Sequence, residues 1–501
     1  MASGLKVSSS KTQIFFSSSV AEDSRCDIAM RLGYAQVEDL GMYLGMPLIH
    51  RRVTTATYAG ILEKAESRLA GWKGRSLSAA GRLTLTRSAL SSFPYYAIQA
   101  VALPSTICNR LDQCGRTFLW GGSTDQRKPH LVPWEDICQP LDCGGLGLKQ
   151  SKFMNEALLM NLEWHMLTKP NLLWVRVMCA KYNLKPNEMT GDFKFPNGSV
   201  CLRAVAKVWP HVRRGTRWAL GNGRRAQFWL DLWANTSEPL ITVAIERIPE
   251  EFIQAPVAEF VTEIGEWWWE KFERFLPTNS LLLIAAVLPP SPSARPDRLV
   301  WGYTPNGVFS TKTTYEALTR GATDPSRPLW RTIWRAPAAQ RVRHFLWLAS
   351  RDRLFTNMER FCRHMAGGAA CGLCGQPEST SHVLRDCVHA RNIWEVLIPN
   401  SIRKEFFVHD ARAWIWSNLV VYSPDGVANW ASIFSITCWR IWTWRNLAVF
   451  SNNFVPLKVK IQDIRRRVDR YVSTMTCEAV LGTRDRHFIL VMDGSLFKGP
   501  T

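Results

Sequence analysis

Apolar residues recur at spacings of three and four between residues 54 and 72, which is the pattern of a helix that buries one face. The members of this apolar stripe are Tyr58, Ile61, Ala65, Leu69 and Trp72. The segment is therefore predicted to form an amphipathic helix.

Two further helices are expected directly after it. The first should run from Ser78 to Phe93 and end there because Pro94 follows. In the second, Ser105 can cap the N-terminus. The residues on its apolar face are Ile107, Leu111, Cys114 and Phe118. Three successive amphipathic helices predict a small helical bundle.

Outside this bundle, short strands and turns are expected. Residues 11–17 (KTQIFFS) and 43–48 (YLGMPL) have strand-like patterns, and residues 122–295 look irregular. Two hairpins are predicted, one around residues 221–223 (GNG) and one around residues 305–307 (PNG). The reason is that Asn and Gly tolerate the positive φ values that tight hairpin turns demand.

The last third of the chain is dominated by helical patterns, after a linker at residues 289–297 (PPSPSARPD). Thr356 precedes Glu359 by three positions, which is a capping-box arrangement, so a helix should begin there. Other helices are expected around residues 330–334, 343–350, 390–397 and within 413–450. The patterns together predict a multidomain α+β fold that is mainly α.

The charge of the chain changes this picture, because it points to a partner. Among 501 residues there are 62 Lys and Arg against 42 Asp and Glu, which gives a net charge of +20 and a pI near 9.6. Such an excess favours a polyanion, either nucleic acid or an anionic membrane surface. No apolar run approaches the roughly 20 residues that a spanning helix needs, so no membrane partner is expected.

Cysteine usage indicates the compartment. The 13 cysteines are an odd number and mostly scattered, and the serine-rich N-terminus does not have the pattern of a secretory signal. Reduced thiols are therefore expected, in the nucleus or cytoplasm rather than outside the cell.

Residues 209–233 (WPHVRRGTRWALGNGRRAQFWLDLW) combine aromatic and basic side chains. Aromatic faces that stack on bases, next to guanidinium groups that meet phosphates, are typical of single-strand-binding surfaces. The alternative is that the tryptophans pack a small core. The candidate nucleic-acid-binding residues here are Arg213, Arg214, Arg217, Trp218, Arg224, Arg225 and Trp229, and those on or near the first two helices are Lys73, Arg75 and Arg82.

Residues 371–387 (CGLCGQPESTSHVLRDC) have the spacing of a metal site, with Cys371, Cys374, His382 and Cys387 as candidate ligands. Two thiolates separated by two residues can bind one ion from a tight turn, and thiolate with imidazole favours Zn²⁺. The nearby substitutes for the fourth ligand are Cys362, His364 and His389. Four protein ligands close the coordination sphere, so the predicted zinc is structural.

Several of these motifs resemble one family. Residues 309–394, from FSTKTTYEAL through the cysteine cluster, resemble the zinc-binding domain that follows the polymerase in plant non-LTR (LINE-type) retrotransposon proteins. SKTQIFFS and YLGMPLIHRR are similar to the end of the reverse transcriptase palm, and RLAGWKGRSLSAAGRLTLTRSAL is similar to its helical thumb. FILVMDGSLFKG at residues 488–499 is similar to the first strand of a ribonuclease H domain, with Asp493 at a metal-binding carboxylate.

The resemblance implies a series of segments along the chain. These are a palm remnant at 1–52, a thumb-like helical bundle at 53–121, a connection region with the Trp/Arg-rich segment at 122–297, the zinc-binding domain at 298–397, a helical connector at 398–484 and the start of a ribonuclease H domain at 485–501.

The resemblance also raises the question of catalysis. Polymerases of this kind use carboxylates on two Mg²⁺ ions, yet the sequence contains no Asp-Asp pair and only Asp493 of the nuclease carboxylates. The expected function is therefore binding of RNA, single-stranded DNA or their hybrid without polymerase or nuclease activity of its own. The alternatives are a zinc-stabilised protein-interaction scaffold and a residual RNA-directed DNA polymerase or ribonuclease H.

Overall fold

The computed structural model describes residues 12–17, 19–39, 42–43, 46–47, 55–71, 77–98, 102–122, 128–184, 198–319, 326–420, 424–451 and 455–481. The chain forms two compact units. Unit 1 contains residues 1–67, 92–111 and 150–320, and unit 2 contains residues 68–91, 112–149 and 321–501. The fold is mainly helical with small two-stranded sheets, as predicted.

Unit 1 begins with short strands. β1 (Gln13–Phe15) confirms the first predicted strand and pairs in parallel with β2 (Ala35–Val37), with α1 (Glu22–Leu32) between them. The strand predicted at 43–48 is instead two paired two-residue strands, β3 (Met42–Tyr43) and β4 (Met46–Pro47). The chain reverses within this segment, because the two strands are antiparallel.

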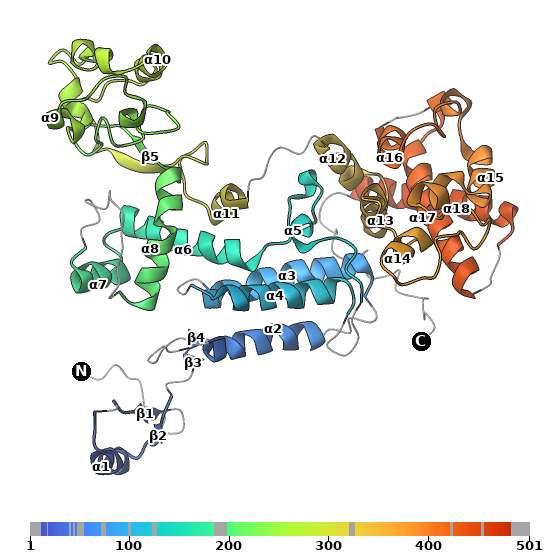
Figure 1. Ribbon diagram of the computed structural model, residues 1–501, viewed down its shortest axis with the longest axis horizontal. Coiled ribbons are helices and arrows are strands. Elements are labelled where there is room, and N and C mark those ends of the chain that lie inside the picture. The colour runs from blue at the N-terminus through green and yellow to red at the C-terminus, as the bar shows by residue number, and fades with distance from the viewer. Residues whose placement is uncertain are drawn as a thin grey trace. The chain divides into compact units, whose positions relative to one another are not determined.

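The three predicted helices following residue 54 are present (Figure 1). α2 (Ala59–Gly71) follows a 3₁₀ turn at Thr55–Tyr58, and α4 (Ser105–Leu119) starts at the predicted residue. α3 (Ala79–Ile98) does not end at Phe93 but continues through Pro94. Proline removes one backbone hydrogen bond but leaves the neighbouring turns intact, so it does not have to end a helix.

Within unit 1, the first residues of α4 pack against the apolar face of α2. The buried cluster contains Tyr58, Ile61, Leu62 and Ala65 from the α2 segment, and Leu103, Ile107, Cys108 and Leu111 from the α4 segment. The helical periodicity therefore predicted correctly that Tyr58, Ile61, Ala65 and Leu69 are buried, whereas Trp72 lies outside the described residues.

The first half of the segment expected to be irregular is helical, which corrects that prediction. α6 (Ser151–Thr168), α7 (Leu173–Tyr182) and α8 (Val200–Gly215) lie there, and α6 packs on α8 and on α11 (Thr311–Thr319). α6 is apolar on several sides, since it contacts more than one neighbour, and this blurs the single stripe that identifies a surface helix.

The two predicted turns are present, with Gly223 and Gly307 at φ +68°, but the prediction that each joins two strands of a hairpin is wrong. β5 (Thr216–Ala219), which precedes the GNG turn, pairs antiparallel with β6 (Arg298–Trp301), which precedes the PNG turn. The GNG loop instead wraps around the carboxylate of Asp297. That carboxylate accepts hydrogen bonds from the backbone N–H groups of Gly221 (2.7 Å), Gly223 (2.9 Å), Arg225 (2.8 Å) and Ala226 (3.2 Å).

The rest of unit 1 is built from short elements around an aromatic core. α9 (Glu250–Ile253), α10 (Thr278–Ala285) and 3₁₀ turns at Leu240–Val243, Val257–Phe260, Trp269–Lys271 and Glu273–Phe275 surround it. The core aromatic residues are Phe228, Trp229, Trp233, Phe260, Trp267, Phe272 and Phe275.

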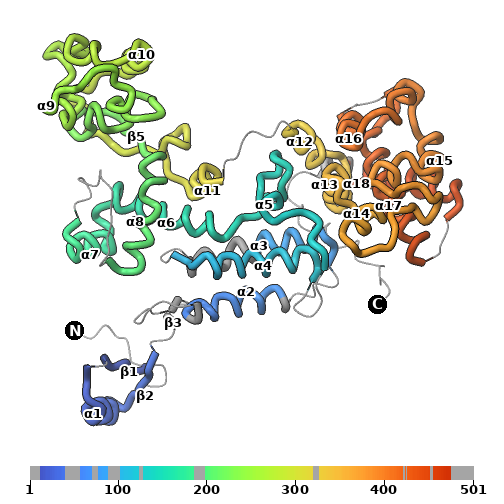
Figure 2. The backbone as a smooth tube through the Cα atoms, viewed as in Figure 1, coloured from blue at the N-terminus to red at the C-terminus, as the bar shows by residue number. Residues whose placement is uncertain are grey.

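Unit 2 is helical and confirms the helices predicted in the last third of the chain (Figure 2). Its longest helices, α17 (Trp430–Ser451) and α18 (Leu457–Leu481), pack on each other, and the core includes Trp347, Trp394, Trp414, Trp430 and Phe434. Its other elements are α5 (Trp134–Ile137), a 3₁₀ turn at Leu141–Cys143, α12 (Arg327–Arg335), α13 (Gln340–Ser350), α14 (Asn357–Cys362), a π-helical turn at His382–Asp386, α15 (Val388–Leu397), 3₁₀ turns at Asn400–Ile402 and Pro424–Gly426, and α16 (Ala411–Val420).

Across the ranges that the structure describes, no helix has both the length and the apolar character required to cross a bilayer.

Candidate metal centre

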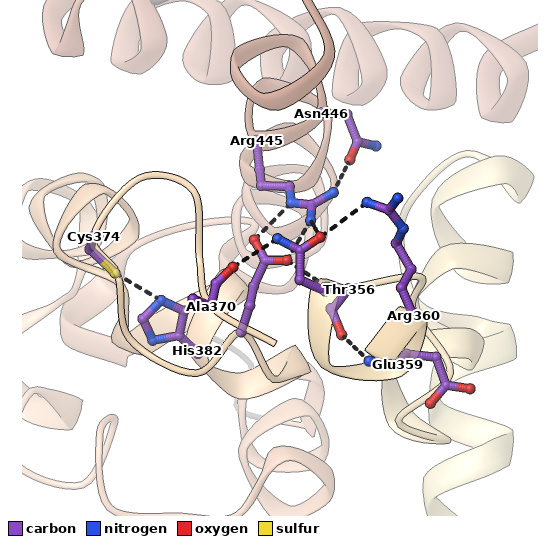
Figure 3. Close-up of polar contacts among 10 residues, drawn as sticks. Thr356, Glu359, Arg360, Ala370, Cys374, His382, Arg445 and Asn446 are labelled. Atoms are coloured by element: carbon purple, nitrogen blue, oxygen red, sulfur yellow. Dashed lines mark hydrogen bonds and ion pairs between the residues drawn. The ribbon is translucent and has the colours of Figure 1, made fainter. Parts of the chain in front are cut away.

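Unit 2 brings together the four residues that the spacing predicted as metal ligands. The ligand atoms of Cys371, Cys374, His382 and Cys387 all lie within 4.8 Å of one another. Sγ of Cys374 is 3.2 Å from Nε2 of His382 and 3.9 Å from Sγ of Cys387. Figure 3 shows Cys374 and His382 pointing toward each other. Three thiols and one imidazole at these distances can surround one tetrahedral ion.

A tight turn positions the first two cysteines. The N–H of Gly375 donates to the carbonyl of Cys371 (2.8 Å), and the N–H of Cys371 donates to the carbonyl of Gln376 (2.7 Å). Gly375 has φ +76°, in the left-handed region that a residue with a Cβ atom adopts at a cost. The two thiols therefore face the same side of the turn.

The other two ligands come from the segment that follows. The hydroxyl of Ser379 accepts a hydrogen bond from the N–H of His382 (3.1 Å) at the start of the π-helical turn. The N–H of Cys387 donates to the carbonyl of His382 (2.7 Å), which closes the turn. The substitutes considered from the sequence, Cys362, His364 and His389, are not members of the cluster found among the described residues.

The electrostatics of the site fit a bound cation. Burial raises the pKa of Cys387 to about 12, and burial also raises the pKa of Cys371. Burial lowers the pKa of His382, which keeps the imidazole neutral and able to coordinate. Burial disfavours thiolates unless a positive charge compensates them, and a divalent ion between the three sulfurs would provide that charge. This soft donor set fits Zn²⁺ better than Mg²⁺ or Ca²⁺.

A buried ion pair lies next to the cluster and was not anticipated from the sequence. Glu378, fully buried, pairs with Arg445 of α17, which is 4% exposed. Nε of Arg445 donates to Oε1 of Glu378 at 2.9 Å, and a second guanidinium nitrogen donates to Oε2. A buried carboxylate needs such a partner. The two residues are 67 positions apart, so no local signal indicates the pair.

The same carboxylate connects the cluster to α14. Oε2 of Glu378 also accepts a hydrogen bond from the N–H of Asn357 (2.6 Å), and Nδ2 of Asn357 donates to the carbonyl of Ala370 (2.9 Å). Thr356 caps α14 as predicted, since its hydroxyl accepts from the N–H of Glu359 (3.2 Å; Figure 3). The loop that carries Cys371 is thus hydrogen-bonded to the first turn of α14.

The candidate nucleic-acid-binding arginines of residues 209–233 lie at the end of α8, in β5 and in the loop after β5. Arg213, Arg214, Arg224 and Arg225 are exposed, whereas Arg217 is half-buried and donates to the carbonyls of Arg214 (2.8 Å) and Thr216 (2.9 Å). A phosphate group can reach an arginine only if its side chain is exposed, and four of these five arginines are exposed.

The tryptophans of this segment differ from one another. Trp218 is half-buried, with the guanidinium carbon of Arg225 at 5.3 Å from its ring centroid. Trp229 is 0% exposed and makes edge contacts with Phe228, Phe260 and Phe275. Base stacking on Trp229 is therefore corrected to core packing, because a base cannot reach a ring enclosed on all sides.

Of the nucleic-acid-binding candidates on or near the first two predicted helices, the structure describes only Arg82. Arg82 is half-buried in unit 2, where Nε donates to the carbonyl of Leu119 (3.1 Å) and another guanidinium nitrogen donates to that of Leu77 (2.8 Å). Burial lowers its pKa. Arg82 therefore links the end of α4, at Leu119, to the segment just before α3, at Leu77. Lys73, Arg75 and Asp493 lie outside the described residues.

Comparison with known proteins agrees with the geometry of the cluster. Residues 309–394 match the family described as zinc-binding in reverse transcriptase. An Arabidopsis thaliana protein named "Putative ribonuclease H protein At1g65750" is 33% identical over 408 residues, which cover 79% of this chain and 64% of that protein. A second protein of the same plant, "Uncharacterized mitochondrial protein AtMg00310", is 26% identical over 150 residues, which cover 30% of this chain and 97% of that protein.

The family match covers the segment that contains all four clustered ligands, and it ends at Trp394 of α15. The chain spans 64% of the length of the first relative, and the aligned part extends well beyond the zinc-binding segment. These matches support an origin shared with plant retrotransposon-derived, reverse-transcriptase-like proteins, and residues 309–394 match the zinc-binding domain of reverse transcriptases.

Proposed function

We propose that this chain is a zinc-dependent nucleic-acid-binding protein whose ligands are RNA, single-stranded DNA or an RNA–DNA hybrid. The observation that supports it most is the Cys₃His cluster inside a domain of the reverse transcriptase zinc-binding type. Cys371, Cys374, His382 and Cys387 would hold one Zn²⁺ in a closed sphere. The ion would then stabilise the fold and leave no open position for an activated water.

The charge of the molecule supports the choice of ligand. The net charge is +20, and Arg213, Arg214, Arg224 and Arg225 are exposed in one short part of unit 1. Arginine side chains that neutralise phosphates release condensed counterions, and this gives affinity without sequence preference. The proposed binding is therefore tolerant of sequence and sensitive to salt.

The test is a salt titration of binding to short labelled single-stranded RNA, single-stranded DNA and a hybrid duplex. Affinity should fall steeply with salt, with a log–log slope of about −0.7 for each phosphate contact on single strands. The double variant Arg213→Gln with Arg214→Gln should flatten the slope on every sequence. The matched control is Arg247→Gln with Arg274→Gln, which removes the same charge from exposed positions elsewhere in unit 1. Equal effects of the two pairs would mean that only total charge matters. Absence of salt-dependent binding would favour the scaffold alternative.

We further propose that these 501 residues bind nucleic acid without polymerase or ribonuclease H catalysis of their own. The support is chemical: the sequence contains no Asp-Asp pair, and the ligand cluster found among the described residues consists of thiols and imidazole. Two-metal catalysis needs several carboxylates around the ions. Primer extension and hybrid cleavage should both be absent with Mg²⁺ or Mn²⁺. Cleavage that disappears in Asp493→Asn would contradict this proposal.

A further inference from the structure

Unit 2 contains an open concavity of about 530 Å³ that none of the features above uses. It lies between the last turns of α4, residues 130–135 and α14 together with the residues that flank it. The lining residues with charged or imidazole side chains are Arg116, His130, Glu135, Arg353, Glu359 and Arg363. We refer to it as the Arg116 concavity.

One of the two carboxylates in the lining is already neutralised. Oε1 of Glu359 pairs with Nε of Arg363 at 2.6 Å, and Oε2 lies 3.6 Å from a terminal nitrogen of Arg353. The remaining nitrogens of Arg363 donate to the carbonyls of His130 (2.8 Å) and Leu131 (3.2 Å). Arg363 therefore holds the wall together, and two guanidinium charges share one carboxylate.

Arg116 is different, because none of the residues that the structure describes pairs with its guanidinium in this way. Its Nε is buried and makes no hydrogen bond in the ranges that the structure describes. A donor that has lost water without gaining an acceptor is unfavourable, so the guanidinium of Arg116 favours an incoming anion. Glu135, the second carboxylate, is exposed, where water screens its charge.

His130 also lies close to the positive charges of Arg116 and Arg363. The pKa of His130 is lowered first by burial and then by the charges of Arg116 and Arg363. The imidazole is therefore neutral at pH 7, so it adds a hydrogen-bond donor to the concavity without adding a charge.

We propose that the Arg116 concavity binds a phosphate group of a nucleic-acid strand, with the guanidinium of Arg116 as its principal contact. A planar guanidinium can make two parallel hydrogen bonds to a phosphate, which a lysine cannot match. This inference rests on the proposed function and assigns part of it to a defined place. It also connects binding to the metal centre, because Glu378 hydrogen-bonds to the first turn of α14.

The first test compares Arg116→Gln with Arg466→Gln in the full chain, using a short labelled single-stranded oligonucleotide. Arg466 is exposed on α18 of the same unit and does not line the concavity, so it controls for the loss of one charge. Arg116→Gln should weaken binding about tenfold, as expected for a lost hydrogen bond between charged groups. Arg116→Lys should restore part of the affinity, and thermal melting of each variant checks the fold. Equal effects of Arg116→Gln and Arg466→Gln would overturn the proposal.

The second test uses Cys362, an exposed thiol in the lining of the concavity. Its rate of alkylation by iodoacetamide, measured by peptide mass spectrometry, should fall when the oligonucleotide is added. The exposed Cys26 of unit 1 serves as the internal control and should not be protected. Protection by inorganic phosphate but not by the oligonucleotide would identify an isolated anion site and reject the strand.

The two proposals can fail separately. If the chain binds oligonucleotides in a salt-dependent way, but Arg116→Gln does not change the affinity and Cys362 is not protected, the phosphate site at the Arg116 concavity is rejected. Nucleic-acid binding by the chain is then retained. A chain that binds no oligonucleotide would reject both.

Discussion

Asp297 illustrates how a single residue organises its surroundings. Its carboxylate is the acceptor for four backbone N–H groups of the loop at 221–226, and the residue is 1% exposed. Burial by itself raises the pKa of Asp297, but these four hydrogen bonds outweigh it, so the pKa is lowered below its ordinary value of 3.8. The ionised form therefore holds the loop.

Replacing Asp297 with Asn should destabilise unit 1 by about 1–3 kcal/mol, because an amide oxygen accepts fewer of these hydrogen bonds. Since the pKa of Asp297 is lowered in the folded state, its contribution is present above pH 3.8 and is lost as the pH falls through the folded value. Urea unfolding of both proteins between neutral and acid pH checks this. The stability gap should narrow with acid, and Glu263→Gln, at an exposed position in the same unit, should show no gap. A gap that does not change with pH would contradict the prediction.

Trp229 tests core packing at the same scale. Trp229→Ala should lower the free energy of unfolding by about 3–5 kcal/mol, because it removes a fully buried ring from the aromatic core. Under conditions where the variant remains folded, its affinity for single-stranded DNA should equal that of the unchanged protein. Normal stability together with weakened binding would show that the ring stacks on a base after all.

At the scale of elements, α14, the cysteine loop and α17 form one hydrogen-bonded assembly. Asn357 of α14 and Arg445 of α17 both bond to the carboxylate of Glu378, which lies between the second and third metal-ligand residues. The buried charges are compensated only while all three elements are in place. This explains why a helix far along the chain matters for the geometry of the cluster.

Glu378→Gln should destabilise unit 2 by about 3–5 kcal/mol, because it leaves the guanidinium of Arg445 buried without a counter-charge. The matched control is Glu395→Gln on α15, whose exposed pair with Arg391 (3.6 Å) should be worth less than about 1 kcal/mol. Thermal and urea unfolding measure both. The double variant Glu378→Gln with Arg445→Met should recover part of the lost stability, because it removes the unpaired charge. If Glu395→Gln were as unstable as Glu378→Gln, the prediction would be wrong.

At the scale of the whole molecule, the metal centre belongs to the core of unit 2. Cys371 and Cys387 are buried members of the same cluster as Trp347, Trp394 and Trp430. If the cluster holds an ion, as proposed, removing that ion should disturb the packing of the whole unit and not only the loop, because metal binding and folding are coupled.

The purified chain should contain one equivalent of Zn²⁺. Cys371→Ser with Cys374→Ser should abolish it and unfold unit 2, since structural zinc supplies folding free energy on the order of 10 kcal/mol in small domains. Elemental analysis and thermal melting measure these effects. Cys26→Ser and Cys362→Ser, at exposed positions outside the cluster, should change neither. A metal-free chain that melts cooperatively at the same temperature would exclude a structural ion.

Several features were determined by residues close together in the sequence. The grouping of Cys371, Cys374, His382 and Cys387, the cap at Thr356 and the buried face of α2 each depend on positions within about four turns of chain. Each of these features can be read from the turn or helix geometry of neighbouring residues, so their spacing was enough to predict them. The mainly helical class followed from the same periodicities.

Only the tertiary structure decided the features whose partners lie far apart. β5 pairs with β6 some 80 residues later, Asp297 holds a loop 76 residues before it, and Glu378 meets Arg445 at a separation of 67. The same is true of the burial of Trp229 and of the Arg116 concavity, whose walls come from α4 and α14. A turn or an aromatic residue looks the same in sequence whether or not a distant segment covers it. Burial, and with it the charge and hydrogen-bonding state of each site, arises from contacts that the local pattern does not contain.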